Sequence, residues 1–403
     1  MRIRIKNFRA IRDQEVELAP ITVVYGPNGA GKSSLILALL SLRAAILSSN
    51  GATSTFFNYG FTSLGGFDAV VFDHLTSNKI DLSLQIHPTT NSFAQHGIVF
   101  GEGQGNYYFH GAMHQDFFNL DVPVSFPYPG NLPTTVNFQS GEHTFPFTWN
   151  GITAQPVAGQ ALAPEATEEL TKILALINSP AELLRRLTAV PLKRGFSKPV
   201  YQTQPLSAAL ITEDEVATYL SSNKYLEAKV SHYLEKILNQ DFRVHVQPGT
   251  AIFSLDATDK KTGLATELVN EGFGVNQMVY FLAKALNPDS LWTCVEEPEI
   301  HLHPSAVRRF AHALQEMVRE DGKNFVISTH SEAFVLALLA MVAEGKLKTE
   351  QLACYFVNKI GKTATFEKQL VKETGQLEGG LTSFMSGEIE DLKHLIGLTA
   401  QGD

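Results

Sequence analysis

The stretch Gly26-Pro27-Asn28-Gly29-Ala30-Gly31-Lys32-Ser33 matches G-x-x-x-x-G-K-[ST], the pattern of a loop that binds phosphate groups. The β-branched run Ile21–Tyr25 before it predicts a buried strand, and the apolar run Ser34–Leu40 after it predicts a helix. Glycines let backbone N–H groups turn toward a phosphate, and a helix N-terminus adds partial positive charge. Strand, loop and helix in this order favour a true phosphate site over an ordinary glycine turn.

Composition bounds the class of protein. A chain of 403 residues can hold two or three domains, or one large domain with insertions. Hydrophobic content of 44% and charged content of 18% are typical of a soluble globular protein. We find no apolar run of eighteen residues and no secretory segment, so we expect no membrane span and a cytoplasmic location. Cys294 and Cys354 lie in predicted strands and are expected to be buried thiols of a reducing compartment.

The net charge of −9 argues against a uniformly basic nucleic-acid binder. Basic residues do cluster locally, between positions 2 and 12 and between positions 185 and 198. Each cluster fits either a solvated face or a contact with DNA, and the sequence leaves both interpretations open.

Three patterns divide the chain. Alternating segments such as Ile80–Ile86, broken by glycine, proline and asparagine, predict an antiparallel sheet with a hairpin tip at Ser140-Gly141-Glu142. Helical periodicity follows, and helix starts are expected at Ser179-Pro180-Ala181-Glu182 and at Thr212-Glu213-Asp214-Glu215. We therefore expect an antiparallel β subdomain over residues 76–160 and a helical lobe over residues 161–249.

After residue 250, buried strands alternate with helices. The continuous apolar runs Leu291–Val295 and Asn324–Ser328 are typical of strands covered on both faces. Helices are expected over 304–319 and 331–344, the second ended by Gly345, and a hairpin over 353–367. Residues 1–75 and 250–403 are therefore expected to share one discontinuous α/β core.

Acidic residues follow the first of these strands. Two carboxylates at the end of a buried strand, Glu296 and Glu297, suit metal-dependent phosphoryl transfer. Glu296 is expected to bind Mg²⁺, as is the Ser33 hydroxyl, while Glu297 would orient and deprotonate the attacking water. His330 ends the next strand, where a neutral imidazole can hydrogen-bond a γ-phosphate. A solvated acidic turn and a structural histidine are the alternative interpretations.

Two weaker signals lie nearby. Glu271–Gln277 places glycines at the start of a helix, which predicts a second anion site. His301 and His303 face the same way on an extended segment and raise the alternative of a zinc site.

The order of these motifs resembles the ABC-type ATPase superfamily, and the RecF, SMC and OLD branch in particular. Ile5–Arg9 is similar to that branch's opening strand and turn, and Glu296–Pro304 is similar to its OLD-type Walker B and D-loop run. The resemblance covers residues 1–75 and 250–403. It implies an α/β P-loop NTPase fold, an ABC-ATPase head with an antiparallel β subdomain and a helical lobe, using ATP and Mg²⁺.

The resemblance also assigns roles. Glu297 and His330 would be the catalytic base and the switch histidine, and Ser33 and Glu296 the metal ligands. The residues expected to contact nucleotide are those of the phosphate loop, the opening turn, the signature and the D-loop: Asn28, Gly29, Ala30, Gly31, Lys32, Ser33, Ser34, Arg9, Gly274, Asn276, Gln277 and His303.

Three departures from the family pattern stand out. Glu296 replaces the Asp of most ABC ATPases, and the signature lacks its serine. No glutamine matches the Q-loop, for which Lys193 or Arg194 is the nearest candidate.

The function implied is an ATP-driven switch that works as a homodimer or higher oligomer of heads, arranged head to tail. It would act on DNA or on a partner effector such as a nuclease or toxin, as in DNA repair or anti-phage defence. The alternatives are a transporter's nucleotide-binding subunit, a self-contained OLD-like ATPase–nuclease, and a non-enzymatic nucleotide sensor.

The poor signature and the large β insertion disfavour the transporter. The nuclease alternative requires a metal-binding Toprim domain. Residues 331–403 are short for such a domain, contain no Asp-x-Asp, and carry acids typical of turns and solvated helices: Glu373, Glu378, Glu388, Glu390 and Asp391.

Overall fold

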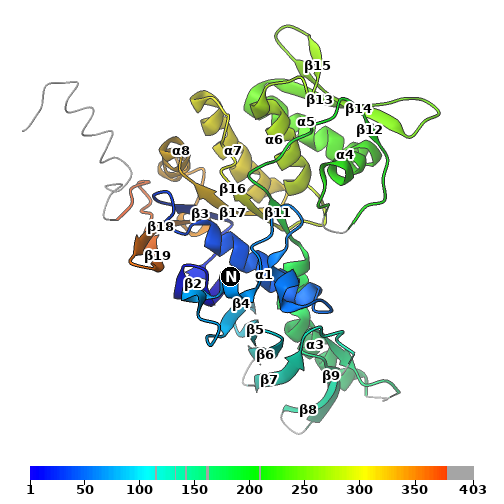
Figure 1. Ribbon diagram of the computed structural model, residues 1–403, viewed down its shortest axis with the longest axis vertical. Coiled ribbons are helices and arrows are strands. Elements are labelled where there is room, and N and C mark those ends of the chain that lie inside the picture. The colour runs from blue at the N-terminus through cyan, green and yellow to red at the C-terminus, as the bar shows by residue number, and fades with distance from the viewer. Residues whose placement is uncertain (114–115, 132, 141–142, 160–162, 208–209, 379–403) are drawn as a thin grey trace, which may run out of the picture.

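In a computed structural model, the structure describes residues 1–113, 116–131, 133–140, 143–159, 163–207 and 210–378. Figure 1 shows three regions along the longest axis of the molecule. A central sheet with helices lies in the middle, an antiparallel β region lies at one end, and a lobe of helices and short strands lies at the other.

The central sheet has the strand order β11-β16-β17-β3-β18-β19. Neighbouring strands are parallel from β11 to β18, and β19 closes the sheet as the antiparallel arm of a hairpin. These strands are β11 (Leu187–Val190), β16 (Trp292–Glu296), β17 (Asn324–Thr329), β3 (Ile21–Tyr25), β18 (Leu352–Ile360) and β19 (Thr363–Gln369). Parallel strands end at one edge of a sheet, so the phosphate loop, Glu296 and His330 are brought to the same edge.

Helices cover both faces of this sheet. Successive residues of β3 point to opposite faces: Val24 packs in the core that includes α1, and Val23 packs in the core formed with α6, α7 and α8. Every residue of β3 is buried, as the continuous apolar run predicts. The covering helices are α1 (Ser33–Leu47), α6 (Phe273–Ala285), α7 (Pro304–Glu320) and α8 (Glu332–Ala343).

The antiparallel region is built on a sheet of order β2-β1-β4-β5-β6-β7. Its strands are β1 (Arg2–Phe8), β2 (Ile11–Glu17), β4 (Ile80–Thr89), β5 (Ser92–Phe100), β6 (Gln104–Met113) and β7 (Asp116–Ser125). Because β1 pairs directly with β4, this sheet crosses the division expected at residue 76. A smaller sheet follows, with β8 (Thr134–Ser140), β9 (His143–Trp149) and β10 (Ala154–Pro156), and α3 (Pro164–Arg185) packs on β5.

The lobe contains a sheet as well as helices. Its elements are α4 (Glu213–Ser222), α5 (Lys224–Leu238), β12 (Tyr201–Gln202), β13 (Gln240–Val246), β14 (Ile252–Asp259) and β15 (Ala265–Glu267). β13 pairs with β14, so the lobe continues past residue 249, where its end was expected. Four short helices complete the described chain: η1 (Thr53–Phe57), α2 (Phe67–Val70), η2 (Phe72–His74) and η3 (Thr349–Gln351).

One expected helix start is wrong. Helix α3 runs without interruption from Pro164 to Arg185, so Ser179 and Pro180 lie inside it. The Ser179 hydroxyl donates to the carbonyl of Leu176, 2.7 Å away, instead of capping a new helix. The buried face of α3 continues through this point, with Ile177, Pro180 and Ala181 all buried, so tertiary packing outweighs the local cap signal.

Other local predictions are confirmed. Thr212 and Glu215 form the capping box of α4, with the Glu215 N–H 3.2 Å from the Thr212 hydroxyl and the Thr212 N–H 2.8 Å from the Glu215 carboxylate. Ser331 caps α8, and Cys294 and Cys354 are buried free thiols. The expected hairpin tip at 141–142 lies outside the described residues. Among the described helices none is long and apolar enough to cross a lipid bilayer.

Candidate active site

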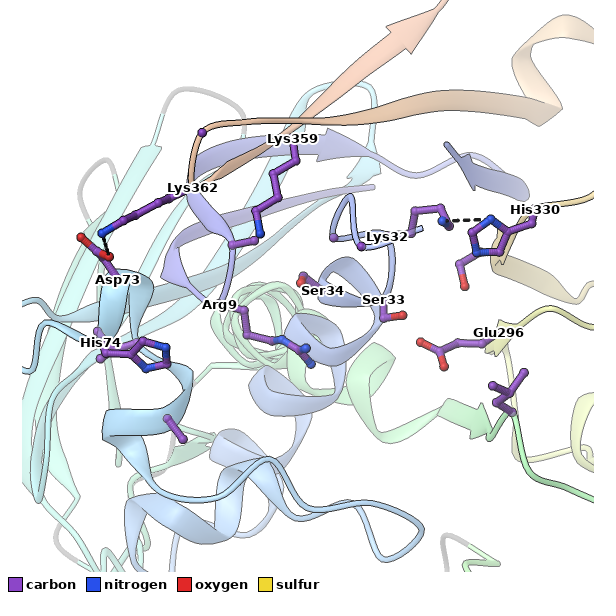
Figure 2. Close-up of a pocket in the computed structure, with 18 of the residues that line it drawn as sticks. Arg9, Lys32, Ser33, Ser34, Asp73, His74, Glu296, His330, Lys359 and Lys362 are labelled. Carbon is purple, nitrogen blue, oxygen red and sulfur yellow. Dashed lines mark hydrogen bonds and ion pairs between the residues drawn. The ribbon is translucent and has the colours of Figure 1, made fainter. Parts of the chain in front are cut away.

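The phosphate loop lines a cavity of about 600 Å³ at the carboxyl edge of the central sheet (Figure 2). The β18–β19 hairpin packs so closely on the phosphate loop that two positions of the loop require glycine. A Cβ at Gly26, whose φ is +143°, would lie 2.2 Å from the carbonyl oxygen of Val357. A Cβ at Gly31, whose φ is +105°, would lie 2.9 Å from the Cβ of Ala364. The loop can therefore keep this shape only with glycine at these positions.

Lys32 is held at the centre of the loop. Its side chain is only 7% exposed, and its ammonium group donates to the carbonyls of Gly26 and Pro27, each 2.9 Å away. Burial lowers the pKa of Lys32, and the nearby carboxylates of Glu297 and Glu296 oppose that shift. The two neutral carbonyls are weak partners for a buried cation, so a phosphate is a better acceptor for the same group.

Backbone N–H groups of the loop are also available to bind a phosphate. Within the described chain, the N–H groups of Gly29, Gly31 and Lys32 have no hydrogen-bond acceptor. These donors lie at the N-terminus of α1, which also contributes partial positive charge. Unsatisfied donors around a cavity of nucleotide size are the arrangement that a polyphosphate satisfies.

Two oxygen-bearing side chains are the candidates for a metal position. Figure 2 shows the Ser33 hydroxyl and the Glu296 carboxylate facing each other across the cavity. Hydroxyl and carboxylate oxygens are the ligands that Mg²⁺ prefers, usually completed by water and by substrate phosphates. Ser33 and Glu296 therefore fit Mg²⁺ and would hold it beside the phosphates.

Glu297 is fixed by its backbone. Its φ of +43° lies in the left-handed region, which is unfavourable for a residue other than glycine. Two hydrogen bonds hold it there: the Glu297 N–H donates to the carbonyl of Ser328 over 2.8 Å, and the Glu297 carbonyl accepts from Arg194 over 2.7 Å. This conformation aims the Glu297 carboxylate into the cavity that the phosphate loop lines.

Arg194 holds the backbone of both acidic residues through hydrogen bonds. Its guanidinium donates to the carbonyls of Glu296 and Glu297, at 3.0 and 2.7 Å, and also to that of Pro191. Burial lowers the pKa of Arg194 to about 10, and the carboxylates of Glu299, Glu297 and Glu296 oppose this. Arg194 thus positions the Glu296–Glu297 backbone, and it lies outside the residues that line the phosphate cavity.

His330 connects Glu297 to the phosphate loop. Its Nδ1 lies 3.3 Å from the Lys32 ammonium, and its Nε2 lies 3.4 Å from a Glu297 carboxylate oxygen. An ammonium group only donates, so Nδ1 is the acceptor and the ring proton is on Nε2, facing Glu297. Burial, together with the charge of Lys32, lowers the pKa of His330, which favours this neutral imidazole.

Several lining residues were missed by sequence reasoning. Arg9, which was expected, lines the cavity on the side opposite Glu296, and it is joined there by Asp73, His74, Lys359 and Lys362. Lys362 forms an ion pair with Asp73 (Figure 2). Basic residues at the tip of the expected 353–367 hairpin were the available signal. Their approach to the loop depends on the pairing of β18 with β3.

The signature and D-loop residues lie apart from this cavity. Gly274, Asn276, Gln277 and His303 are not among its lining residues. A Cβ at Gly274 would lie 2.8 Å from the carbonyl of His301, and the rings of Phe273 and His301 are 5.5 Å apart. The start of α6 and the D-loop therefore form one continuous surface, on which Phe273 is 72% exposed.

Side chains on that surface have local roles. The Asn276 amide is buried and bonds to both backbone groups of Phe196 and to the carbonyl of Leu268. His303 caps α7, where its Nδ1 accepts from the N–H of Ser305. In the described chain no group of three or more histidines, cysteines or acids is placed to bind a metal, so the zinc alternative gains no third ligand there.

Known protein families match two separate segments of this chain. Residues 2–50 match the AAA domain family and residues 171–335 match the AAA ATPase domain family. Over 355 residues the chain is 24% identical to the OLD nuclease of Thermus scotoductus, covering 83% of this chain and 59% of that protein. These matches support an ABC-type ATPase of the RecF, SMC and OLD branch. An ATPase of this kind implies nucleotide binding, usually with Mg²⁺.

Solved structures of similar fold are SMC head domains. The SMC head bound to the C-terminal winged-helix domain of ScpA superposes with a TM-score of 0.50 at 10% identity, covering 92% of this chain and 98% of that one. The SMC head domain of Thermotoga maritima gives a TM-score of 0.39, also at 10% identity, covering 91% and 97%. The likeness to the ScpA-bound SMC head confirms the expected P-loop NTPase head fold. Between the two family matches lie β4 to β10, which are the strands of the antiparallel region other than β1 and β2.

Proposed function

We propose that this chain binds ATP with Mg²⁺ and hydrolyses it between two identical heads arranged head to tail. The observation that carries the proposal is the convergence of Lys32, Glu297 and His330 on one cavity that also contains the Ser33–Glu296 oxygen pair. Bound Mg²⁺ would neutralise phosphate charge at that pair. Lys32 and the loop N–H groups would hold the phosphates, and Glu297 would take the proton of the attacking water.

His330 is suited to respond to the state of this site. It contacts Lys32 on one side and Glu297 on the other, so a charge that changes at either partner changes the hydrogen bonding of the ring. A neutral ring with its proton on Nε2 can donate to a carboxylate or to a phosphate oxygen. We therefore assign His330 the role of coupling phosphate occupancy to the strand end of β17 and to α8, which begins two residues later.

Pairing of two heads is supported by the surface around Gly274. The N–H groups of Phe273 and Gly274 at the start of α6 have no acceptor in the described chain, and no acidic residue lies in the first helical turn. An anion from outside the chain would satisfy these donors. Phe273, a large apolar side chain exposed beside them, favours a partner surface at the same place. The γ-phosphate held by a second head fits both features.

The paired heads would act as a switch on a partner effector or on DNA. The two basic clusters give little support to direct DNA contact, since Arg2 and Arg4 pair with acids of β2 and Lys198 pairs with Asp214. A partner effector, such as a nuclease or toxin held or released as the heads open, therefore ranks first. We also propose that the protein works in the cytoplasm, in anti-phage defence or in DNA repair.

The test separates binding from chemistry. Lys32→Ala should lose ATP binding in isothermal titration, because the ammonium contact to the phosphates is removed. Glu297→Gln should bind ATP as the wild type does but release phosphate about 10²–10⁴-fold more slowly, since a positioned base contributes that much. Glu320→Gln, which changes an exposed acid on α7, serves as the matched control and should hydrolyse normally. Wild-type turnover by Glu297→Gln would remove Glu297 from the role of base.

A further inference from the structure

A second cavity, of about 420 Å³, lies between α1 and α6 and shares no lining residue with the phosphate cavity. Its walls come from α1, from the segment after η1, from β11 and from α6. Two of the lining side chains are cations, Arg43 from α1 and Lys284 from α6. None of the lining residues is acidic.

Arg43 is partly buried and lacks the protein partners that an arginine in such a position normally has. Its Nε is inaccessible to water and has no hydrogen-bond partner, and within the described chain its guanidinium forms no hydrogen bond or ion pair. Burial lowers the pKa of Arg43. The residue as a whole is only partly buried, so its other guanidinium N–H groups can reach water in the cavity. Buried polar atoms in folded proteins are nearly always hydrogen-bonded, and an Nε–H without an acceptor is costly to the fold.

Lys284 adds a second charge to the same cavity. It is 5% exposed, and its ammonium group donates to the carbonyl of Leu210 at 2.8 Å. Burial lowers its pKa to about 8, and the positive charge of Arg43 acts in the same direction. Glu215, whose charge opposes this shift, is itself engaged by the N–H groups of Ser207 and Thr212 at 2.8 Å each. The cavity therefore has an excess of positive charge.

The other side chains that line the cavity indicate which kind of ligand would fit beside the two cations. Leu40, Leu47, Tyr59, Phe61 and Tyr280 supply apolar and aromatic surface. A volume of 420 Å³ lies within the range of small-molecule sites and suits a molecule the size of a nucleoside monophosphate. Arginine and lysine together are a common pair for a phosphate group.

We propose that this cavity binds a small phosphorylated metabolite with a flat apolar body, its phosphate between Arg43 and Lys284. Such a ligand would join α1, which follows the phosphate loop, to α6, which begins at the signature. Its binding would therefore stabilise one relative position of these two helices. The proposal does not depend on ATP hydrolysis.

The experiment uses AMP and inorganic phosphate as probes, with the full chain carrying Lys32→Ala so that the phosphate loop does not contribute. We expect isothermal titration to show AMP binding. Adding Arg43→Met should weaken that binding by about tenfold to a hundredfold, the usual loss for a charged hydrogen-bonding partner. Arg319→Met, which changes an exposed arginine on α7, is the control and should leave the affinity unchanged.

A second measurement separates a ligand site from a structural arginine. Without ligand, Arg43→Met should raise the thermal midpoint, because a partly buried charge with an unsatisfied Nε–H is replaced by an apolar chain of similar length. A lowered midpoint with unchanged AMP affinity would show that Arg43 is structural and overturn the proposal. No AMP binding to the Lys32→Ala chain, or binding of inorganic phosphate as tight as that of AMP, would also overturn it.

Discussion

At the scale of single residues, the candidate site depends on backbone positions that are individually unfavourable. Glu297 and Arg9 both have positive φ values, 43° and 52°, at which residues other than glycine are destabilised by about 1–3 kcal/mol. Hydrogen bonds from Arg194 and to Ser328 offset this at Glu297. Such strain is retained where an exact side-chain direction matters, which agrees with a catalytic position for the Glu297 carboxylate.

A buried histidine should couple stability to pH in the antiparallel region. His96 is fully buried, and burial lowers its pKa to about 4 from the ordinary 6.5. Its Nε2–H donates to the carbonyl of Gly151 at 2.7 Å, while its Nδ1 has no partner. The folded state therefore binds fewer protons than the unfolded state between pH 6.5 and about 4. The contribution of neutral His96 to the free energy of unfolding is fully present above pH 6.5. It is lost as the pH drops through that window, by up to about 3 kcal/mol.

His96→Gln tests this, because an amide can still donate to Gly151 but does not titrate. Urea unfolding at pH 7.5, 6.5 and 5.5 should show a shallower loss of stability in the variant than in the wild type, whatever its stability at pH 7.5. His110→Gln, an exposed position in the same sheet, is the control and should keep the wild-type slope. Equal slopes in all three proteins would contradict the assignment to His96.

The sequence predicts residues of the site where the signal is local. Lys32 and Ser33 follow from the loop pattern, and Glu296 and Glu297 follow from acids behind a buried strand. The contacts of Arg194 with Glu296 and Glu297 join residues 102 and 103 positions apart, so no local pattern reveals them. The sequence did place Lys193 or Arg194 near the site as a Q-loop substitute, but the supporting role of Arg194 required the structure.

At the scale of elements, local signals succeed when packing agrees with them. The capping box at Thr212 forms because α4 begins there with its buried face starting at Val216. The equally plausible cap at Ser179 fails because the apolar face of α3 already passes through it. An N-cap contributes about 1 kcal/mol, which is less than the burial of a helical turn of apolar side chains.

The start of α6 is an element with a testable role. In the proposed dimer, Gly274 faces the γ-phosphate of the partner head. Gly274→Asp places a carboxylate against that phosphate and should abolish ATP-dependent dimerisation of the Glu297→Gln protein, measured by light scattering. The helix itself should tolerate the change, because an acid in the first turn interacts favourably with the helix dipole.

Steric effects need their own control, since any Cβ at Gly274 approaches the His301 carbonyl to 2.8 Å. Gly274→Ala brings the same crowding without the charge, and it should retain most of the dimer. A Gly274→Asp protein that dimerises and hydrolyses ATP normally would rule out this surface as the partner's phosphate site.

At the scale of the whole molecule, strand pairing departs most from the expected division. The start of the chain contributes β3 to the central sheet but β1 and β2 to the antiparallel sheet, where β1 lies between β2 and β4. β11, from the expected helical lobe, completes the central sheet beside β16. Periodicity predicts strands such as β3 and β16 but not β11, which lies in the expected helical lobe. The pairings of β1 with β4 and of β11 with β16 join residues more than 70 positions apart, and no local pattern of the sequence reveals them.

The relative from Thermus scotoductus is named a nuclease. We propose that this chain leaves any DNA cleavage to a partner. Metal-dependent nucleases hold one or two ions among several carboxylates, about 3.5–4 Å apart when there are two. Here Glu296 and Glu297 face the phosphate cavity, and Glu373 and Glu378 are exposed. In the described chain no cluster of three potential ligands occurs, and Glu388, Glu390 and Asp391 lie outside it.

The purified chain should therefore leave linear, nicked and supercoiled DNA intact with ATP and either Mg²⁺ or Mn²⁺, in gels run over hours. Glu297→Gln run in parallel identifies any cutting that depends on ATP hydrolysis. Cleavage that persists in Glu297→Gln but is lost when Glu388, Glu390 and Asp391 are changed to alanine would place a nuclease in this chain itself. Cleavage that appears only after a second protein is added would instead locate the chemistry in the effector. The ATPase heads would then only control when that effector cuts.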